Sequence, residues 1–349
     1  MIQVYGKLVG RGQPTFVVAE IGNNHNGDLE LAKKTVLAAA FAGADAVKFQ
    51  KRFLDEVFTK ELLSAPQTSS RSLGETYGEY RQSLELTEEQ FMELKNLAHS
   101  LGMAFGVTPF DLKSVEFLAA IGMDFWKVAS FDATHPQLLE AVAKKGQPIF
   151  LSTGMSTLEE RDHAVDTIRK FNPDQLVVLH CVSIYPTPPE DLNIGAISTL
   201  RKRYDDLPIG YSGHEEGFVP TVSAVAIGAC AVERHLTTDK TLPGPDHATV
   251  SLNPIEFHQM VHEIRKIEKA VADKNIYLHE GERKHRKKHA KNIVARVAIP
   301  AGTLVSEDMI AFKSTGRGGM KPTLIHTVVG KIAKVDLAPD SVILEEHLK

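Results

Sequence analysis

The chain has 349 residues and a formal net charge of -4, with 43% hydrophobic and 24% charged residues. This composition is typical of a globular protein large enough for two domains, and the near-neutral charge argues against nucleic acid as a partner. The longest apolar stretches, such as residues 222–232, are too short to cross a bilayer, so no membrane partner is expected. The first residues lack a signal-peptide pattern, and we expect a cytoplasmic protein. Cys181 and Cys230 are then expected to be buried thiols, with a disulfide as the lesser alternative.

Short apolar runs alternate with longer stretches of helical period between residue 16 and about residue 271. The runs expected to form strands are residues 16–21, 46–50, 103–108, 125–128, 148–152, 176–180, 208–212 and 230–235. Helices are expected between them, for example at residues 29–42, 87–101, 135–145, 157–171 and 218–228. Eight strand–helix units over about 250 residues predict an α/β fold, a (β/α)8 TIM barrel. A doubly wound open sheet is the alternative.

Two segments depart from this alternation. Residues 51–86 form a long insertion after the second strand, and a loop of this length is usually functional or packs on a partner. Residues 282–291 are strongly basic, which favours a solvated linker or helix face over a patch that binds an anionic ligand.

The pattern changes again after Lys291, where short strand-like runs alternate with tight turns. We therefore expect a barrel at residues 1–275, a basic linker at 276–291 and a small mostly-β domain at 292–349. So small a module is expected to lean on the barrel or on another subunit.

Polar and ionisable side chains gather where the predicted strands end. They are Glu20, Asn24, His25, Lys48, Gln50, Thr108, Lys127, Ser130, Asp132, Ser152, His180, Tyr185, Ser212, His214 and His235. In a barrel of parallel strands this edge carries the active site. Taken singly, each residue is more often a surface or capping residue, but together they predict a binding site.

Two kinds of chemistry are indicated at this edge. Lys48 and Lys127, together with nearby hydroxyl groups, are suited to hold a small phosphorylated carboxylate. His214 and His235 follow adjacent strands, so their imidazoles are expected to lie side by side as a half-filled metal site. A lone histidine is usually structural, but two with carboxylates nearby and no cysteine ligand favour Mn²⁺, Mg²⁺ or Co²⁺.

The ordered motifs along the chain resemble the sialic acid synthases, and the tail resembles their antifreeze-like (SAF) module. The motifs are Ala19-Glu20-Ile21-Gly22-Asn23-Asn24-His25-Asn26-Gly27, Val47-Lys48-Phe49-Gln50, Thr108-Pro109-Phe110, Ser152-Thr153-Gly154-Met155, His180-Cys181, Tyr185-Pro186-Thr187, Ser212-Gly213-His214, Glu233-Arg234-His235 and Gly244-Pro245-Asp246-His247. The resemblance implies a TIM barrel with a SAF domain. It also implies a transferase that condenses phosphoenolpyruvate with N-acetylmannosamine, or its 6-phosphate, to give a nine-carbon 2-keto acid. A divalent ion, typically Mn²⁺, and a domain-swapped homodimer are further implications.

The resemblance also implies a role for each matching residue. His214 and His235 would hold the metal, and Glu20 and Asp132 would join them in catalysis. The residues expected to bind phosphoenolpyruvate are Lys48, Thr108, Lys127, Ser130, Ser152, Ser183 and Ser212. Those expected to bind the sugar are Gln50, Tyr185, Asp246 and Arg317.

Some positions depart from the family pattern. Ser183 stands where many bacterial members have asparagine. Arg317 is displaced from the position of the usual arginine of the SAF module, and the alternative to a role in sugar binding is that Arg317 is a plain loop residue. The segment around Arg81 looks like the animal enzymes, which accept a 6-phosphorylated sugar; Arg71 and Arg81 are candidates for that phosphate, and ordinary surface charge is the alternative. A synthase for legionaminic, pseudaminic or deaminated neuraminic acid, and a non-catalytic sugar-phosphate binding protein, remain alternatives.

Overall fold

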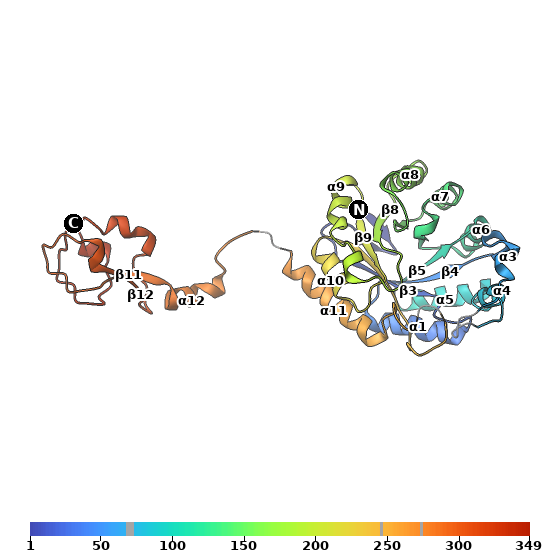
Figure 1. Ribbon diagram of the computed structural model, residues 1–349, viewed down its shortest axis with the longest axis horizontal. Coiled ribbons are helices and arrows are strands. Elements are labelled where there is room, and N and C mark those ends of the chain that lie inside the picture. The colour runs from blue at the N-terminus through green and yellow to red at the C-terminus, as the bar shows by residue number, and fades with distance from the viewer. Residues whose placement is uncertain (68–72, 245–246, 273–274) are drawn as a thin grey trace. The chain divides into compact units, whose positions relative to one another are not determined.

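The structure is a computed structural model that describes residues 1–67, 73–244, 247–272 and 275–349 (Figure 1). The chain divides into two compact units, residues 1–273 and residues 274–349. In the part of the chain that the structure describes, no helix is both long and apolar enough to span a bilayer.

The first unit is a closed barrel of eight parallel strands, as predicted. In the order around the barrel the strands are β10 (Ala231–His235), β3 (Phe16–Gly22), β4 (Ala46–Lys51), β5 (Ala104–Pro109), β6 (Phe125–Val128), β7 (Ile149–Ser152), β8 (Leu176–Cys181) and β9 (Ile209–Gly213). Each predicted strand lies within one residue of the observed bounds, because buried parallel strands are short, apolar and bounded by turns.

Helices cover the outside of the barrel (Figure 1). They are α1 (Leu29–Ala42), α5 (Glu88–Ser100), α6 (Leu112–Ile121), α7 (Pro136–Ala143), α8 (Leu158–Arg169), α9 (Ala196–Arg203), α10 (Val219–Ala226) and α11 (Pro254–Ala270). Capping fixes their ends: the Asp28 carboxylate accepts from the first free N–H groups of α1, and Gly43 ends that helix at φ 85°. The helices pack on the outward side chains of the strands, such as Val17 and Val47.

The inward side chains of the strands divide the barrel interior into two halves. At the amino-terminal ends they are apolar and include Phe16, Phe125 and Phe150, whose rings pack together. A hairpin of β1 (Ile2–Val4) and β2 (Lys7–Val9) adds its apolar residues to this cluster. Because side chains alternate along a strand, the next inward positions lie toward the carboxyl ends, and these are the polar residues of the predicted site.

The segment between β4 and α5 contains α2 (Leu54–Val57), α3 (Lys60–Leu63) and α4 (Tyr77–Gln82). The expected long insertion is therefore built of short helices where it is described. Arg71, a candidate from the sequence, lies outside the described residues.

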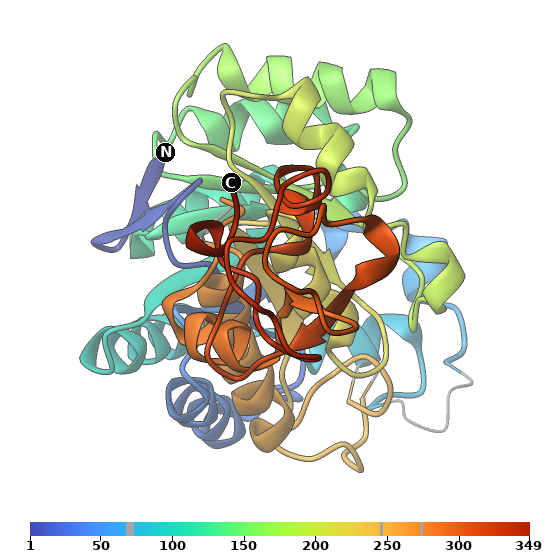
Figure 2. The same ribbon diagram turned by 90° about the vertical axis from the view of Figure 1, so that its left-hand side faces the viewer.

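The second unit is a small fold of short strands and 3-10 turns (Figure 2). It begins with α12 (Glu280–His289), so much of the basic segment is helical. β11 (Lys291–Ala295) pairs antiparallel with β12 (Ile310–Ser314) over a core that includes Ile293 and Ile299. Its 3-10 turns are η3 (Glu307–Met309), η4 (Pro322–Thr327) and η5 (Glu345–His347).

Candidate active site

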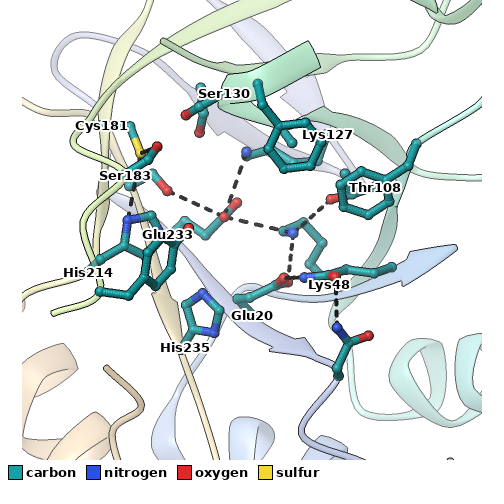
Figure 3. Close-up of a pocket in the computed structure, with 18 of the residues that line it drawn as sticks. Glu20, Lys48, Thr108, Lys127, Ser130, Cys181, Ser183, His214, Glu233 and His235 are labelled. Carbon is teal, nitrogen blue, oxygen red and sulfur yellow. Dashed lines mark hydrogen bonds and ion pairs between the residues drawn. The ribbon is translucent and has the colours of Figure 1, made fainter. Parts of the chain in front are cut away.

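A cavity of about 250 Å³ lies at the carboxyl ends of the barrel strands (Figure 3). Twelve of the residues expected from the sequence line it together: Glu20, Lys48, Gln50, Thr108, Lys127, Ser130, Ser152, Ser183, Tyr185, Ser212, His214 and His235. They come from seven strands and from the segments that follow β6, β8 and β9, which the closed barrel brings to one place.

Two lysines and two glutamates form the charged centre of the cavity (Figure 3). Lys48 Nζ lies 2.7 Å from Glu20 Oε2 and donates to Thr108 Oγ1 at 2.8 Å. Glu233 Oε1 lies 3.8 Å from the Nζ atoms of both Lys48 and Lys127. All four charged side chains are buried, so their charges interact strongly.

Burial shifts the protonation of these groups. It raises the pKa of the Glu20 carboxyl, although the adjacent Lys48 works in the opposite direction. Burial also lowers the pKa of the Lys127 ammonium group, with Glu233 opposing that shift. Binding of an anion in the cavity would therefore be favourable, because the anion would supply a further partner for the buried lysines.

The two histidines lie side by side, as the sequence predicted. Their ring centroids are 5.5 Å apart, because β9 and β10 are neighbours in register. His214 Nδ1 lies 3.0 Å from the carbonyl oxygen of Val182; since a carbonyl only accepts, this nitrogen donates and Nε2 keeps its lone pair in the neutral ring. Burial, reinforced by His214, lowers the pKa of His235 well below its usual range. A neutral imidazole is the form that binds metal ions.

These two imidazoles could supply only some of the ligands that a divalent ion needs. No group of three or more His, Cys, Asp or Glu side chains within the described residues is arranged to hold a metal. The protein therefore offers two nitrogen ligands from His214 and His235, and the other positions of an ion would be taken by oxygen atoms of water and substrate.

One residue of the described barrel with an expected catalytic role does not line the cavity. Asp132 is buried at the end of η1 (Ser130–Asp132), but its neighbour Phe131 lines the cavity instead and stacks on Phe110. Burial raises the pKa of Asp132 to about 7, with Arg52 opposing. Arg317 is exposed in the second unit, and Asp246 lies outside the described residues.

One strand-end residue points the other way. His180 was expected at the active edge, but its ring faces out of the barrel and its Nε2 contacts the carbonyl oxygen of Leu192 at 2.9 Å. The next residue, Cys181, lines the cavity, with Sγ 3.8 Å from His214 Nδ1. Burial tends to raise the pKa of this thiol, but the combined effect of His214, Ser130 and Lys127 lowers the pKa to about 7.

Sequence reasoning missed further cavity residues, notably Glu233 and Arg52. A signal for each was available in the period of two along the strands. Glu233 precedes His235 by two positions, and Arg52 follows Lys48 and Gln50 at the same interval, so each shares an inward face with a predicted residue.

Comparison with known proteins extends these observations. Residues 35–276 match the NeuB family and residues 291–349 match the SAF domain. N-acetylneuraminate-9-phosphate synthase of Homo sapiens is 40% identical over 98% of this chain and 94% of the human protein. N,N'-diacetyllegionaminic acid synthase of Legionella pneumophila is 36% identical over 97% of this chain and 96% of its own.

The crystal structure of the spore coat polysaccharide biosynthesis protein SpsE from Bacillus subtilis shares the fold, with a TM-score of 0.67 and 32% identity. The match covers 100% of this chain and 99% of that one. The two family matches, the named relatives and the shared fold agree, so the resemblance to the sialic acid synthases is confirmed. The chain belongs to the NeuB family.

Proposed function

We propose that this protein condenses phosphoenolpyruvate with N-acetylmannosamine, or with its 6-phosphate, and water. The products are N-acetylneuraminic acid, or its 9-phosphate, and inorganic phosphate. The observation that carries the proposal is the single cavity in which buried Lys48 and Lys127 face the paired imidazoles of His214 and His235. The name of the human relative supports the same reaction.

Phosphoenolpyruvate is an anion with a phosphate and a carboxylate, which matches two buried lysines surrounded by hydroxyl groups. Thr108, Ser130, Ser152, Ser183 and Ser212 supply these hydroxyls. Ser152 Oγ and Glu233 Oε2 have no hydrogen-bond partner within the described residues. Buried polar atoms normally have partners, so this arrangement supports a polar ligand in the cavity.

His214 and His235 would hold the divalent ion, for which Mn²⁺ is the first choice. Such an ion would polarise the aldehyde oxygen of the open-chain sugar. The residues themselves fix the geometry, because the Val182 carbonyl orients the ring of His214 and burial keeps His235 neutral.

The bond changes balance without an oxidant or reductant. C3 of phosphoenolpyruvate bonds to the aldehyde carbon, whose oxygen takes a proton. The oxygen of a water molecule bonds to C2, and the C2–O bond to phosphate breaks. Of the two protons that the water loses, one balances the proton taken by the aldehyde oxygen and the other leaves with the phosphate. Glu20 is suited to carry a proton in this sequence, because burial raises its pKa and Gln50 and Lys48 hold its carboxyl group in place.

The sugar contacts belong to the same proposal. Gln50 and Tyr185 line the cavity and would contact the acceptor. Asp246 would contact it as well, and Asp132 would act on the reacting water. Arg317 would reach the acceptor from the partner of a domain-swapped homodimer.

An acceptor panel tests the proposed reaction. The protein, Mn²⁺ and phosphoenolpyruvate are incubated with N-acetylmannosamine, its 6-phosphate, mannose 6-phosphate and a 2,4-diacetamido hexose, and products are identified by mass. We expect a nine-carbon 2-keto acid and an equal amount of phosphate from N-acetylmannosamine or its 6-phosphate, and no product after metal removal.

Other outcomes favour the alternatives. Turnover of the diacetamido sugar would indicate a legionaminic or pseudaminic acid synthase, and turnover of mannose 6-phosphate a deaminated product. The legionaminic alternative has direct support, because a relative named for that product is 36% identical. Absence of phosphate release with every sugar would overturn the enzyme proposal and leave a sugar-phosphate binding protein.

A further inference from the structure

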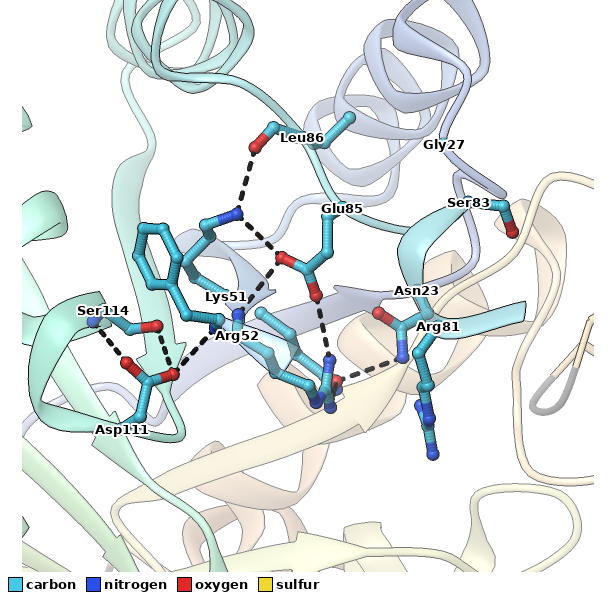
Figure 4. A network of polar contacts seen from close by, with 12 residues as sticks. Asn23, Gly27, Lys51, Arg52, Arg81, Ser83, Glu85, Leu86, Asp111 and Ser114 are labelled. Carbon is cyan, nitrogen blue, oxygen red and sulfur yellow. Dashed lines mark hydrogen bonds and ion pairs between the residues drawn. The ribbon is translucent and has the colours of Figure 1, made fainter. Parts of the chain in front are cut away.

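A second group of cations lines the cavity, beyond the buried lysines. Arg52 directly follows β4, and Arg81 lies on α4. Arg52 takes part in the network of polar contacts drawn in Figure 4, which joins the end of β4 to the segment that follows α4, and Arg81 is drawn beside this network without a contact to it. The reaction centre described above does not use either guanidinium.

Arg52 is buried and firmly held. Its Nη2 donates to Gln50 Oε1 at 2.5 Å, and its guanidinium carbon lies 3.9 Å from the centre of the Phe110 ring. Glu85 Oε1 is 3.8 Å from Nη1, which is a long contact for an ion pair. Burial lowers the pKa of Arg52 to about 10, and the charge of Arg81 adds to that effect. The two arginines are therefore close enough to repel each other.

Among the described residues, Arg81 has fewer polar contacts than Arg52. Its Nε donates to the Tyr77 hydroxyl at 2.9 Å, and its guanidinium lies over the Tyr77 and Tyr80 rings at 5.1 and 5.3 Å. It forms no ion pair within the residues that the structure describes, although it lines the cavity and is half-buried. A cation that lines a cavity without a carboxylate partner is suited to bind an anion.

Contacts of the segment that follows α4 hold the two arginines in position. Glu85 Oε2 accepts from Lys51 Nζ at 2.9 Å and from the Arg52 N–H at 3.1 Å, which ties the segment after α4 to the end of β4. Gly27 approaches Ser83 so closely that a Cβ atom on Gly27 would lie 2.0 Å from the Ser83 carbonyl oxygen. α4 is thus fixed at both contacts, and Arg81 is preorganised.

The backbone of Arg52 lies farther toward the carboxyl end of the barrel than that of Lys48. Lys48, Gln50 and Arg52 follow each other at intervals of two, so at about 3.3 Å per residue Arg52 lies about 13 Å along the chain from Lys48. An open-chain amino sugar carries its aldehyde at C1 and a 6-phosphate at the opposite end. With its aldehyde at the histidines and buried lysines, the far end of the sugar would extend toward the rim.

We propose that Arg52 and Arg81 form a binding site for the phosphate of a phosphorylated amino sugar, which makes the 6-phosphate the preferred acceptor. This inference rests on the proposed function. Guanidinium groups match phosphate oxygens in a forked, bidentate geometry, so a dianion between them relieves their mutual repulsion.

The test compares both acceptors in one set of variants. For the wild type we expect kcat/KM to be higher with N-acetylmannosamine 6-phosphate than with N-acetylmannosamine. In Arg81→Gln, kcat/KM for the phosphorylated sugar should fall about 30-fold, about 2 kcal/mol at 1.36 kcal/mol per tenfold. The KM for phosphoenolpyruvate and kcat/KM for the unphosphorylated sugar should change less than about threefold. Arg81→Lys should recover part of the loss, because it restores the charge but not the fork.

Arg169→Gln, an exposed arginine on α8, is the matched control and should leave both acceptors unaffected. Equal losses with both sugars in Arg81→Gln would mean a structural role and overturn the site. A wild type that prefers the unphosphorylated sugar would also overturn it, while the proposed reaction would stand.

A wild type that turns over neither sugar would overturn the reaction, and the site is then judged by calorimetry. Binding of mannose 6-phosphate but not mannose, lost in Arg81→Gln, would support the site; no binding, or binding unchanged in that variant, would overturn it.

Discussion

The guanidinium Nη1 of Arg234 lies 2.6 Å from Glu215 Oε1, and both side chains are buried on the outer face of the barrel strands. Arg234 also donates to the Glu215 carbonyl oxygen at 2.8 Å. Because Arg234 directly precedes His235 and Glu215 directly follows His214, this ion pair ties together the two segments that carry the imidazoles.

Removal of one partner of this pair should destabilise the barrel. Glu215→Leu leaves the charge of Arg234 buried without a carboxylate, and we expect the free energy of unfolding to fall by about 3–5 kcal/mol. Urea unfolding followed by the fluorescence of Trp126, the single tryptophan and buried in β6, measures the change.

The double variant Glu215→Leu with Arg234→Met is the control, because it removes both charges. It should be more stable than the single variant. A single variant that loses less than about 1 kcal/mol, or a double variant that loses more than the single one, would contradict this account.

The proposed metal ligands can be tested by binding as well as by activity. His235→Ala should weaken Mn²⁺ binding, measured by calorimetry in the absence of substrates, at least about tenfold, because it removes one of two nitrogen ligands. Activity should fall in parallel. His258→Ala, an exposed histidine on α11, is the control and should bind Mn²⁺ as the wild type does. Unchanged Mn²⁺ affinity in His235→Ala would show that His235 is not a ligand.

Acid should destabilise the barrel through His25. This ring is buried against Phe49, its Nδ1 accepts from the Gly27 N–H at 3.0 Å, and burial lowers its pKa to about 4. Above the ordinary pKa of about 6.5 the ring is neutral in both states, so the native state is fully stable there. Between pH 6.5 and 4 the unfolded chain binds a proton that the folded chain does not, so stability falls by about 3 kcal/mol as the pH falls.

The variant His25→Asn isolates this effect, because an asparagine oxygen can accept from the same N–H without titrating. Its unfolding free energy should decline less than that of the wild type over this range. Parallel pH profiles for the two proteins would rule out His25 as the titrating group.

The proposed dimer makes a prediction about mixed subunits. Arg317→Ala should raise the KM for the acceptor, and His235→Ala should abolish turnover. If each Arg317 completes the partner's site, a mixed dimer of the two variants contains one intact site. Equal, random mixing should then restore about a quarter of wild-type activity. A mixture no more active than its separate components would place Arg317 outside the partner's site.

The barrel and the inward set of residues were predictable because both follow from periodicity. Strands that are buried on both faces are apolar runs, and their last inward side chains must converge in a closed barrel. The β1–β2 hairpin was missed because three-residue strands are too short to show a period; its turn at Tyr5 and Gly6, with φ of 45° and 80°, was the available signal.

The remaining differences have local causes. His180 and Cys181 are adjacent, and only the register of β8 decides which of them faces inward. Asp132 was expected at the strand end, but it belongs to the 3-10 turn η1, where its neighbour Phe131 lines the cavity instead. Arg81 was a candidate from the family resemblance, but its position at the cavity depends on the docking of a six-residue helix by contacts distant in sequence, which no local pattern reveals.

The apolar cluster at the amino-terminal end of the barrel, which includes residues of the β1–β2 hairpin, has a consequence for turnover. Because aromatic rings and the hairpin fill the amino-terminal end of the barrel, that end offers no passage to a solute. In the proposed reaction, both reactants, the released phosphate and the much larger sugar acid would share the opposite mouth. A product still bound at that mouth would then block the next phosphoenolpyruvate, so product release and substrate binding would have to alternate.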